Sequence, residues 1–499
     1  MSKNPEAAEY GDFQTPPTLA QSVCELLARD HGNPAALLEP TCGFGNFLFA
    51  GLDRFPSIQQ ALGSDINAAY VASAKAVLRD RPDAEKVRLT TADFFQTDWL
   101  SVFADLPAPI LILGNLPWVT SAGLGTLKSR NLPEKANFQN HHGLDAITGK
   151  ANFDISEWML IRLVEALNGR QGVIAMLCKS SVARKVLAHC WRKKISLATS
   201  ALYRIDSALH FDVAVDAVLL VMELTPAANQ TTAEVFPGLR AGQAEAVIGF
   251  EDGLLLADVN AYRGGRHLRG AESIKWRSGI KHDCSKVMEL FGEGERFRNG
   301  LGELVELEET FIYPMLKGSD VANSRTTTNR FMLVTQRSVG EDTARIETIA
   351  PRTWDYLVAH SALLDKRGSS IYRNRPSFSI FGVGEYSFAP WKVAICGFYK
   401  RLRFAVVGPL GDKPVVLDDT SYFLPCQTKL DAEFLAGLLN SPAAQAFYRA
   451  FVFWDAKRPI TAEILRRLDL RRLSEQAGMA HEFDLLELGS NREPLLWPA

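Results

Sequence analysis

The sequence predicts an α/β fold, with a mostly parallel sheet in a first domain and mixed α+β structure in a second. In residues 1–225, short apolar runs alternate with amphipathic stretches of helical period. Such alternation indicates a parallel sheet with helices on both faces. The pattern stops near the segment TPAANQ at 225–230. We therefore expect domains at residues 1–228 and 229–499.

The first domain is expected to contain seven strands. They are predicted at 36–39, 61–66, 87–91, 109–114, 172–178, 201–206 and 214–223, with helices near 18–29, 67–78, 153–167 and 180–194. Only 207–213 separates the last two strands, which is too short for a crossover helix, so the last strand should be antiparallel. Ligands of such sheets bind outside the carboxyl ends of the strands, so we expect the chemistry in those loops.

Composition narrows the class of protein. The chain has 499 residues, 47% of them hydrophobic and 22% charged, with a net charge of −2, which excludes a uniformly basic nucleic-acid coat but not a local basic face. The seven cysteines form no CxxC pair, so we expect neither a zinc site nor a disulfide framework. A secretory signal and an apolar run of roughly 18–20 residues are both missing, so we expect a cytoplasmic protein without a membrane anchor.

The segment LEPTCGFGNFL at 38–48 follows the first predicted strand and opens a helix. Gly43 and Gly45 permit a tight turn and let the backbone approach a ligand. Glu39 and Thr41 in the same loop are further candidate ligand contacts. A plain strand-to-helix turn is an alternative, and a dinucleotide-binding loop is a weaker one because the last glycine of GxGxxG is missing.

Acidic residues end the next two predicted strands. Asp65, followed by Ile66, is placed to accept hydrogen bonds from two ribose hydroxyls. Asp93 could accept from an adenine amino group while Phe94 packs on the ring. Each acid alone could instead be a helix cap or a solvated carboxylate, but three such loops in succession favour a nucleoside-containing ligand.

The fourth predicted strand runs into Asn115, Leu116, Pro117 and Trp118. An adenine amino group is a poor nucleophile because its lone pair is delocalised into the ring. Accepting both N–H hydrogens, from the Asn115 side-chain oxygen and the Leu116 carbonyl, would draw that nitrogen toward tetrahedral geometry. Trp118 offers a flat surface for an extruded base. The alternative is a turn with a buried tryptophan.

This tetrapeptide resembles the [DNS]-P-P-[YFW] motif of the amino-methyltransferases, in a domain similar to the class I methyltransferase fold. The segment GDFQTP at 11–16 resembles the family's N-terminal cofactor motif, which implies cofactor contacts for Phe13 and Thr15. Thr15 could instead cap a helix with Pro16 at its first position. The resemblance implies S-adenosylmethionine as cofactor, with contacts that include Asn115. Leu116 departs from the family's usual proline.

The order of these motifs resembles the gamma group of DNA adenine-N6 methyltransferases, which accompany restriction systems or act alone. The resemblance covers about 225 residues. It implies double-stranded DNA as substrate, base flipping, and a possible separate restriction endonuclease as partner. In the turn at 207–213, Phe211 lies where the family places an aromatic residue against the target base, although simple packing explains it equally well.

Residues 122–152 form a long predicted loop, which we expect to close over the flipped base or touch DNA. His141 and His142 in this loop lack further ligands at suitable spacing, so no metal is expected.

A basic and aromatic stretch marks the second domain, where strands are expected near 304–307, 330–334, 392–397 and 404–407. Basic side chains neutralise phosphates, so we expect DNA contacts here, with solvated loops beside core aromatics as the alternative. The segment FLAGLLNS at 434–441 is loosely similar to the end of recognition domains in gamma-type enzymes. The proposed DNA contacts are Arg373, Arg375, Lys392, Lys400, Arg401 and Arg403.

The sequence thus predicts a sequence-specific DNA adenine-N6 methyltransferase with a C-terminal recognition domain. A methyltransferase acting on RNA adenine or a protein glutamine is one alternative. A DNA-recognition subunit that holds cofactor but is inactive through Leu116 is another.

Overall fold

The computed structural model describes residues 13–119, 154–270 and 274–486. The chain divides into two compact units, Met1–Val259 and Asn260–Ala499. The first unit therefore ends 31 residues after the boundary predicted at residue 228. The reason is that three further strands, at residues 232–256, continue the sheet of the first unit.

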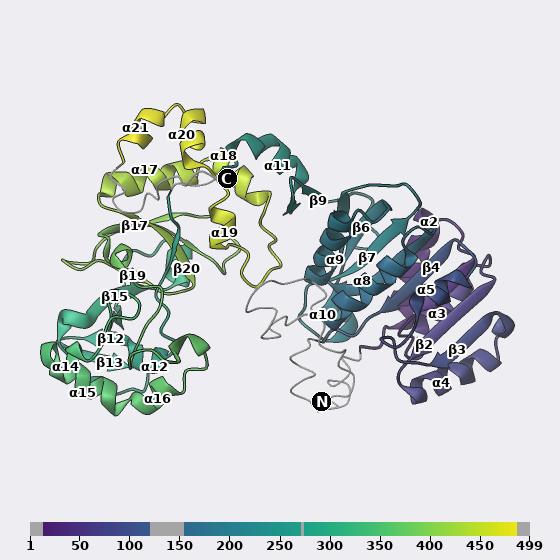
Figure 1. Cartoon of the computed structure of the whole chain (residues 1–499), viewed down its shortest axis with the longest axis horizontal. Helices are drawn as coiled ribbons and strands as arrows, with labels where there is room; N and C mark the ends of the chain where they lie inside the picture. Colours follow the sequence, from purple (N-terminus) through teal and green to yellow (C-terminus); the bar gives the residue numbers. More distant parts are fainter. Residues whose placement is uncertain (1–12, 120–153, 271–273, 487–499) are drawn as a thin grey trace. The chain divides into compact units, whose positions relative to one another are not determined.

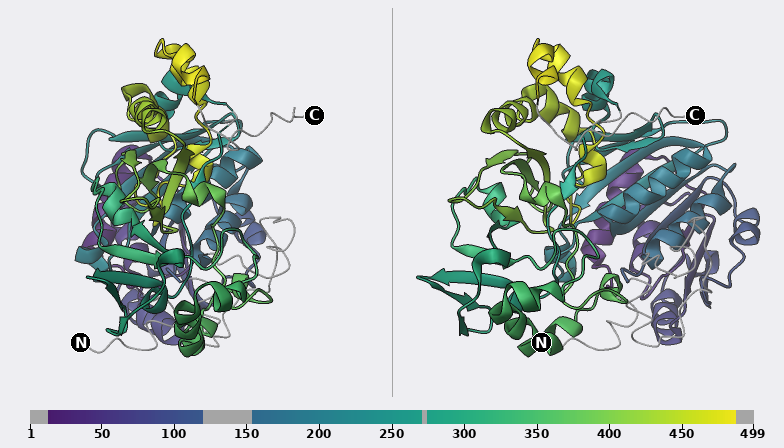
Figure 2. Two further views of the ribbon diagram at one scale, coloured as in Figure 1. Left: turned by 90° about the vertical axis from the view of Figure 1, so that its left-hand side faces the viewer. Right: turned by 60° about the vertical axis from the view of Figure 1, so that its left-hand side comes forward.

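Unit 1 is built on one large mixed sheet (Figures 1 and 2). In the described residues its order is β10-β9-β8-β6-β7-β5-β4-β1-β2-β3, so ten strands replace the predicted seven. β1 to β5 are parallel, and β7 is antiparallel to both β5 and β6, which confirms the prediction for the last strand. The strands are β1 (Ala36–Glu39), β2 (Gln60–Asp65), β3 (Val87–Thr91), β4 (Ile110–Asn115), β5 (Gly172–Lys179), β6 (Leu197–Ile205), β7 (Ala217–Leu224), β8 (Thr232–Phe236), β9 (Ala246–Glu251) and β10 (Leu254–Leu256).

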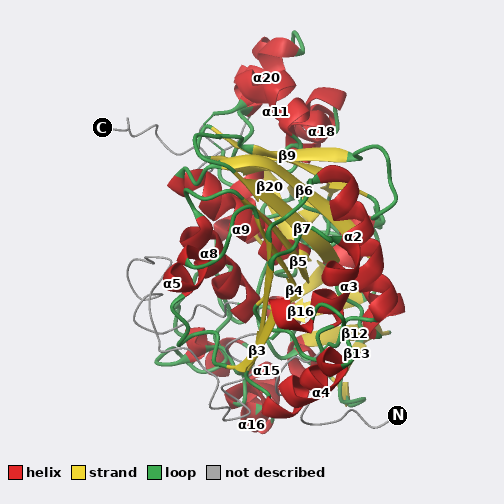
Figure 3. Ribbon diagram, turned by 90° about the vertical axis from the view of Figure 1, so that its right-hand side faces the viewer, coloured by secondary structure: helices red, strands yellow, loops and turns green. Residues whose placement is uncertain are grey.

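Helices cover both faces of this sheet (Figure 3). On one face lie α2 (Pro17–Asp30), α3 (Asn46–Arg54) and α4 (Ala68–Arg79). On the other lie α5 (Trp99–Ala104), α8 (Ile155–Leu167) and α9 (Ser180–Lys193). The central strands β1, β4 and β5 are buried almost throughout, as expected for a sheet covered on both faces.

Short side chains define where several of these helices begin. Asn67 accepts a hydrogen bond from the Ala69 backbone at the start of α4. Asp98 and Asp154 accept from Ser101 and Ser156 at the starts of α5 and α8. Such N-caps satisfy backbone donors that have no partner inside the helix. A five-residue helix, α10 (Ser207–Phe211), occupies the turn between β6 and β7.

Unit 2 contains two sheets (Figures 1 and 2). Four strands form the sheet β11-β20-β17-β18, and six form β14-β13-β12-β16-β15-β19. Helix α17 (Lys429–Leu439) packs on the first sheet. The strands are β11 (Arg277–Ser278), β12 (Glu289–Glu293), β13 (Arg296–Asn299), β14 (Leu304–Val305), β15 (Ile312–Leu316), β16 (Arg330–Leu333), β17 (Trp391–Cys396), β18 (Ala405–Val407), β19 (Val416–Leu417) and β20 (Ser421–Cys426).

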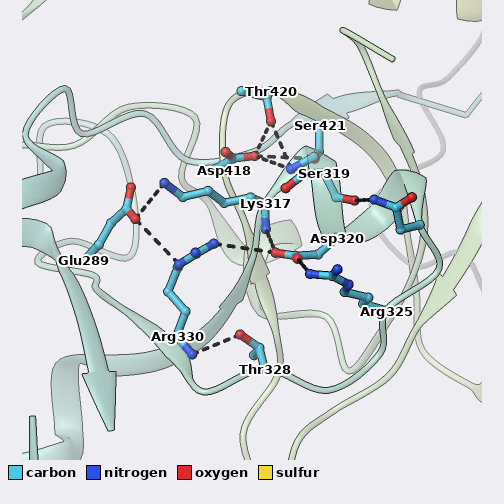
Figure 4. Close-up of polar contacts among 12 residues, drawn as sticks. Glu289, Lys317, Ser319, Asp320, Arg325, Thr328, Arg330, Asp418, Thr420 and Ser421 are labelled. Carbon is cyan, nitrogen blue, oxygen red and sulfur yellow. Dashed lines mark hydrogen bonds and ion pairs between the residues drawn. The ribbon is translucent and has the colours of Figure 1, made fainter. Parts of the chain in front are cut away.

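A polar network joins these two sheets at the short helix α13 (Gly318–Ala322) (Figure 4). Asp418, after β19, accepts hydrogen bonds from the Gly318 backbone at 3.1 Å and the Thr420 hydroxyl at 2.6 Å. On the other side, Glu289 lies 2.7 Å from the Lys317 ammonium and 3.8 Å from Arg330. The Asp418 contacts therefore connect the end of the six-stranded sheet to the start of β20, and the Glu289 contacts lie within the six-stranded sheet.

No helix among the described residues is both long and apolar enough to cross a bilayer.

Candidate active site

A cavity opens at the edge of the unit 1 sheet where β1, β2, β3 and β4 end. Eleven of the residues singled out in the sequence line it, which brings the glycine loop, both acidic loops and the start of the tetrapeptide together. They are Phe13, Thr15, Glu39, Thr41, Gly43, Asp65, Ile66, Asp93, Phe94, Asn115 and Pro117. The parallel order of the strands explains this convergence, because their carboxyl ends share one edge.

The glycine loop has the tight geometry that its sequence indicates. Gly43 and Gly45 have φ of 49° and 83°, and Gly45 is the residue immediately before α3. A Cβ on Gly43 would lie 2.5 Å from Oε1 of Gln14. Glycine is favoured here by its left-handed backbone, and an added Cβ would also displace the end of the Gln14 side chain. Gly43 lines the cavity, whereas Gly45 does not.

Asp65 ties the glycine loop to the end of β2. Its Oδ2 accepts a hydrogen bond from the Gly43 backbone at 2.9 Å, and its Oδ1 accepts from the Asn67 backbone at 2.8 Å. Asp65 also lines the cavity, so its carboxylate is a candidate acceptor for a ligand there.

Glu39 is buried beneath the loop. Its Oε2 accepts a hydrogen bond from the Leu48 backbone at 2.8 Å, in the first turn of α3. Burial raises the pKa of Glu39 well above its usual range, against the lowering effect of that hydrogen bond. Glu39 therefore supports the loop from below as well as lining the cavity.

Asp93 and Phe94 follow β3. Oδ1 of Asp93 accepts from the Phe95 backbone at 2.8 Å, which fixes the turn after the strand. Phe94 is buried against Trp99, with ring centroids 4.8 Å apart. Phe95, which the sequence did not single out, also lines the cavity.

Asn115 is held with its amide oriented. Its Nδ2 donates to the Phe13 carbonyl at 2.7 Å, and its backbone carbonyl accepts from the Thr41 hydroxyl at 3.3 Å. Its Oδ1 is buried and has no hydrogen-bond partner among the described residues. An unsatisfied buried acceptor costs stability unless a ligand pairs with it, so this oxygen is a candidate contact for a donor in the cavity.

Trp118 lies differently from the prediction of a flat surface for a base, whereas the prediction for Leu116 concerns its carbonyl and stays a prediction. Their side chains are buried and do not line the cavity. Trp118 packs against Phe13 and Phe211, with ring centroids 5.6 Å and 5.1 Å away. In this structure the indole therefore belongs to an aromatic cluster beside the cavity, because the two neighbouring rings cover it.

Thr15 lines the cavity and does not cap α2. The N-cap of that helix is Pro16, without a side-chain hydrogen bond, and Pro17 is its first residue. The capping alternative for Thr15 is therefore wrong. The Thr15 carbonyl accepts from Nδ2 of Asn46 at 2.8 Å, which attaches the N-terminal segment to α3.

Several lining residues were not found from the sequence. Gln14 lies over the glycine loop, and its Oε1 accepts from the Phe44 backbone at 3.4 Å. The sequence signal that could have identified Gln14 is its position between Phe13 and Thr15 in the GDFQTP segment. Ile155 and Met159 reach the cavity from α8. The sequence indicates that α8 has an apolar face, but it does not indicate which strand ends that face contacts.

The proposed DNA contacts of unit 2 fall into two groups. Arg373, Arg375, Lys400, Arg401 and Arg403 are exposed. Lys392 is 1% exposed and donates to the Ala389 carbonyl at 2.5 Å, so a phosphate contact is excluded and that prediction is wrong. Burial lowers the pKa of Lys392 to about 7. The residue lies on β17, where residues on both faces are buried, so a side chain there is enclosed whichever way it points.

Some predictions fall outside the described residues, namely those for the loop 122–152, for His141 and His142, and for Gly11 and Asp12. Within the part of the chain that the structure describes, no group of three or more His, Cys, Asp and Glu residues is placed to hold a metal ion.

No protein-family model matches the chain. The chain is 48% identical over 469 residues to the Type II methyltransferase M.NspV of Nostoc sp., an alignment that covers 94% of this chain and 97% of the relative. The chain belongs to the Type II methyltransferase family. For a methyltransferase of this family, the cavity described above is the candidate active site.

The methyltransferase also resembles a solved structure of the Type IIL restriction-modification enzyme MmeI in complex with DNA. The TM-score is 0.55 at 14% identity, over 90% of this chain and 64% of MmeI. The chain thus spans less than two thirds of MmeI. At this identity the similarity concerns the fold, and it extends over both units.

Proposed function

We propose that the protein is a sequence-specific DNA methyltransferase that transfers a methyl group from S-adenosylmethionine to the N6 amino group of adenine. One observation carries the proposal. Asn115, whose Oδ1 is buried and has no hydrogen-bond partner among the described residues, lines the same cavity as Gly43, Asp65 and Asp93. The kinship with M.NspV and the fold shared with MmeI, which was solved with DNA, support it. The motif order further supports a gamma-type enzyme of class I fold.

The cavity residues fit the cofactor. Asp65 and Asp93 offer carboxylate acceptors for ribose hydroxyls and an adenine amino group, and the backbone at Gly43 has no Cβ to obstruct a ligand. Phe13, Thr15, Glu39 and Ile66 complete the set that would hold it. When bound, S-adenosylmethionine supplies a methyl group on a sulfonium centre, which a nitrogen lone pair can displace.

The chain's own part in the reaction is to bind and polarise the target amino group. Oδ1 of Asn115 accepts one of its N–H hydrogens, and the Leu116 carbonyl accepts the other. The nitrogen lone pair is thereby freed from the ring, and preorganised acceptors of this kind stabilise the developing charge. The base must leave the duplex to reach this cavity. Phe211, which is only partly buried and packs on Trp118, is the aromatic residue proposed to contact the base.

The exposed basic residues Arg373, Arg375, Lys400, Arg401 and Arg403 are proposed to neutralise DNA phosphates. This assigns target recognition to unit 2. A separate restriction endonuclease is the proposed partner in a restriction-modification system of the cytoplasm.

The test is transfer of label from tritiated S-adenosylmethionine to DNA, RNA and protein acceptors, followed by analysis of the modified product. We expect N6-methyladenine in DNA. Label in RNA, in a protein glutamine or in N4-methylcytosine would overturn the substrate assignment. Cofactor binding without transfer to any acceptor would favour the inactive recognition subunit.

Asn115→Ala is the matching variant. Because it removes the only side-chain acceptor proposed for the amino group, kcat should fall by at least about 100-fold. The Kd for S-adenosylmethionine, measured by calorimetry, should stay within about threefold. Asn33→Ala, in an exposed loop at the other end of β1, is the control. Loss of cofactor binding in Asn115→Ala would show that its role is misassigned.

A further inference from the structure

The segment Asn115–Trp118 is fixed at both ends by contacts from other parts of the chain. At its start, the Asn115 amide donates to the Phe13 carbonyl at 2.7 Å. At its end, the Trp118 carbonyl accepts a hydrogen bond from Nζ of Lys179 at 3.1 Å. The second contact involves a residue that plays no part in the cavity lining or in the proposed chemistry.

Lys179 is itself rigidly anchored. It is the last residue of β5 and pairs with Ala217 of β7. The next residue, Ser180, donates its backbone N–H to the Asp216 carbonyl at 2.9 Å and begins α9. The main chain on both sides of Lys179 is therefore held, so its ammonium group projects from a fixed position.

Asp154 orients the Lys179 side chain. Oδ2 of Asp154 lies 2.5 Å from Nζ, and Oδ1 accepts from the Ser156 backbone and hydroxyl at the start of α8. Asp154 is 7% exposed, and both oxygens of this buried carboxylate are paired. The adjacent Ile155 N–H donates to the Val119 carbonyl at 3.0 Å. Two consecutive carbonyls thus accept hydrogen bonds from neighbouring groups: Trp118 from the Lys179 ammonium, and Val119 from the Ile155 N–H next to Asp154.

We propose that Lys179 is a positioning residue that holds the Trp118 carbonyl and, through it, keeps the Asn115–Trp118 segment in register with the cavity. The inference rests on the proposed function of that segment. Leu116 leaves one more backbone dihedral free than a proline would, because only proline fixes φ. A hydrogen bond from a rigid strand end to the carbonyl two residues later restricts that freedom. Misplacing reacting groups by about 1 Å can cost on the order of 100-fold in rate.

Three variants separate positioning from stability. Lys179→Met removes the donor to Trp118 and breaks the ion pair with Asp154. Asp154→Asn breaks the same ion pair but leaves the Lys179 ammonium able to donate. The double variant, which combines Lys179→Met with Asp154→Asn, removes both charges, so neither is left unpaired. Lys185→Met is the control, since Lys185 pairs with Glu157 at 2.8 Å between α9 and α8 without touching the tetrapeptide.

The measurements are the steady-state kcat, the KM for DNA, the Kd for S-adenosylmethionine and the Tm. For Lys179→Met we expect kcat to fall about 10- to 100-fold with KM and Kd within about threefold. Asp154→Asn should lose less, Lys179→Arg should recover part of the rate, and Lys185→Met should keep it. The double variant should regain Tm over Lys179→Met while its kcat stays low.

Two outcomes would overturn the proposal. One is a kcat for Lys179→Met within threefold of the unaltered protein. The other is recovery of kcat together with Tm in the double variant, which would make the ion pair merely structural. Failure of the unaltered protein to methylate DNA adenine would instead refute the proposed function, so the two failures are distinguishable.

Discussion

At the scale of single residues, the glycine loop shows how little room the candidate site leaves for change. Gly43 combines a φ of 49° with a neighbour, Gln14, at 2.5 Å from where its Cβ would be. The neighbour is the end of a side chain and can move, but the backbone strain remains. The same position donates its N–H to Asp65, so a shift of the loop also moves a proposed cofactor contact.

Gly43→Ala should therefore lower the free energy of unfolding by about 1–2 kcal/mol, because alanine is strained in the left-handed region. It should also weaken S-adenosylmethionine binding at least about 10-fold. Gly437→Ala is the matched control, since Gly437 lies exposed in α17 with nothing within 4 Å of an added Cβ. There alanine should stabilise by about 0.5–1 kcal/mol without affecting the cofactor. Chemical denaturation and calorimetry measure both, and equal affinities in the two variants would contradict the assignment of the loop.

At the scale of elements, a charge network beside α13 adds side-chain contacts among β12, β15 and β16, which are neighbours in one sheet of unit 2. Glu289 begins β12 and faces cations from two other elements, Lys317 after β15 and Arg330 at the start of β16. Burial acts to raise the pKa of Glu289, but hydrogen bonds from His282 and Lys317 outweigh it and leave the pKa below its ordinary value of 4.5. The charged form of Glu289 is thus the one that the fold stabilises.

Glu289→Gln should lower the free energy of unfolding at pH 7 by about 1–2 kcal/mol, since two partly buried cations lose their counter-charge. A carboxyl whose pKa is lowered by folding stabilises above its unfolded pKa of 4.5 and loses that effect as pH falls through the folded pKa. The difference between the variant and the unaltered protein should therefore be constant above about pH 5.5 and shrink in more acidic solution. Glu293→Gln, on the same strand but exposed, should lose less. Denaturation curves from pH 3.5 to 8 test this, and a difference that grows toward acid would contradict it.

The positions of the strands in the chain and of the loops after them were predictable, because each rests on local patterns. Apolar runs located β1 to β7, and the polar residues after them located the cavity. The side-chain directions of Trp118 and Lys392 were not predictable in the same way. Trp118 turns toward Phe13 and Phe211, which are distant in sequence, and Lys392 turns inward on a strand whose partner β20 lies some 30 residues later. A basic residue in a basic stretch gives no sign of its own burial.

At the scale of the whole molecule, the proposed function requires a DNA-binding face on a chain whose net charge is −2. The basic residues must therefore act locally. Lys400, Arg401 and Arg403 lie exposed in one short segment between β17 and β18. Each phosphate neutralised by such a residue contributes about 0.9 to the slope of log K against log salt concentration.

Replacing Lys400, Arg401 and Arg403 together by glutamine should weaken DNA binding at low salt and reduce that slope by up to about 2.7. Lys392→Met supplies the control within the same stretch of sequence. Because Lys392 is buried, its replacement should leave the slope unchanged. Fluorescence anisotropy with a labelled duplex at several salt concentrations makes the comparison. Equal slopes for the triple variant and the unaltered protein would place the DNA face elsewhere.

The three strands after β7 determine where the chain should be joined in a chimaera with a relative. β8 pairs with β6 in parallel, and β9 and β10 follow it in antiparallel order. A chimaera joined at residue 228 would take β8, β9 and β10 from the relative, so β6 would have to pair with a foreign β8. A poor match there would expose the edge of β6, and exposed strand edges promote aggregation. A junction after β10, near residue 259 where the first compact unit ends, would keep all ten strands of the sheet together.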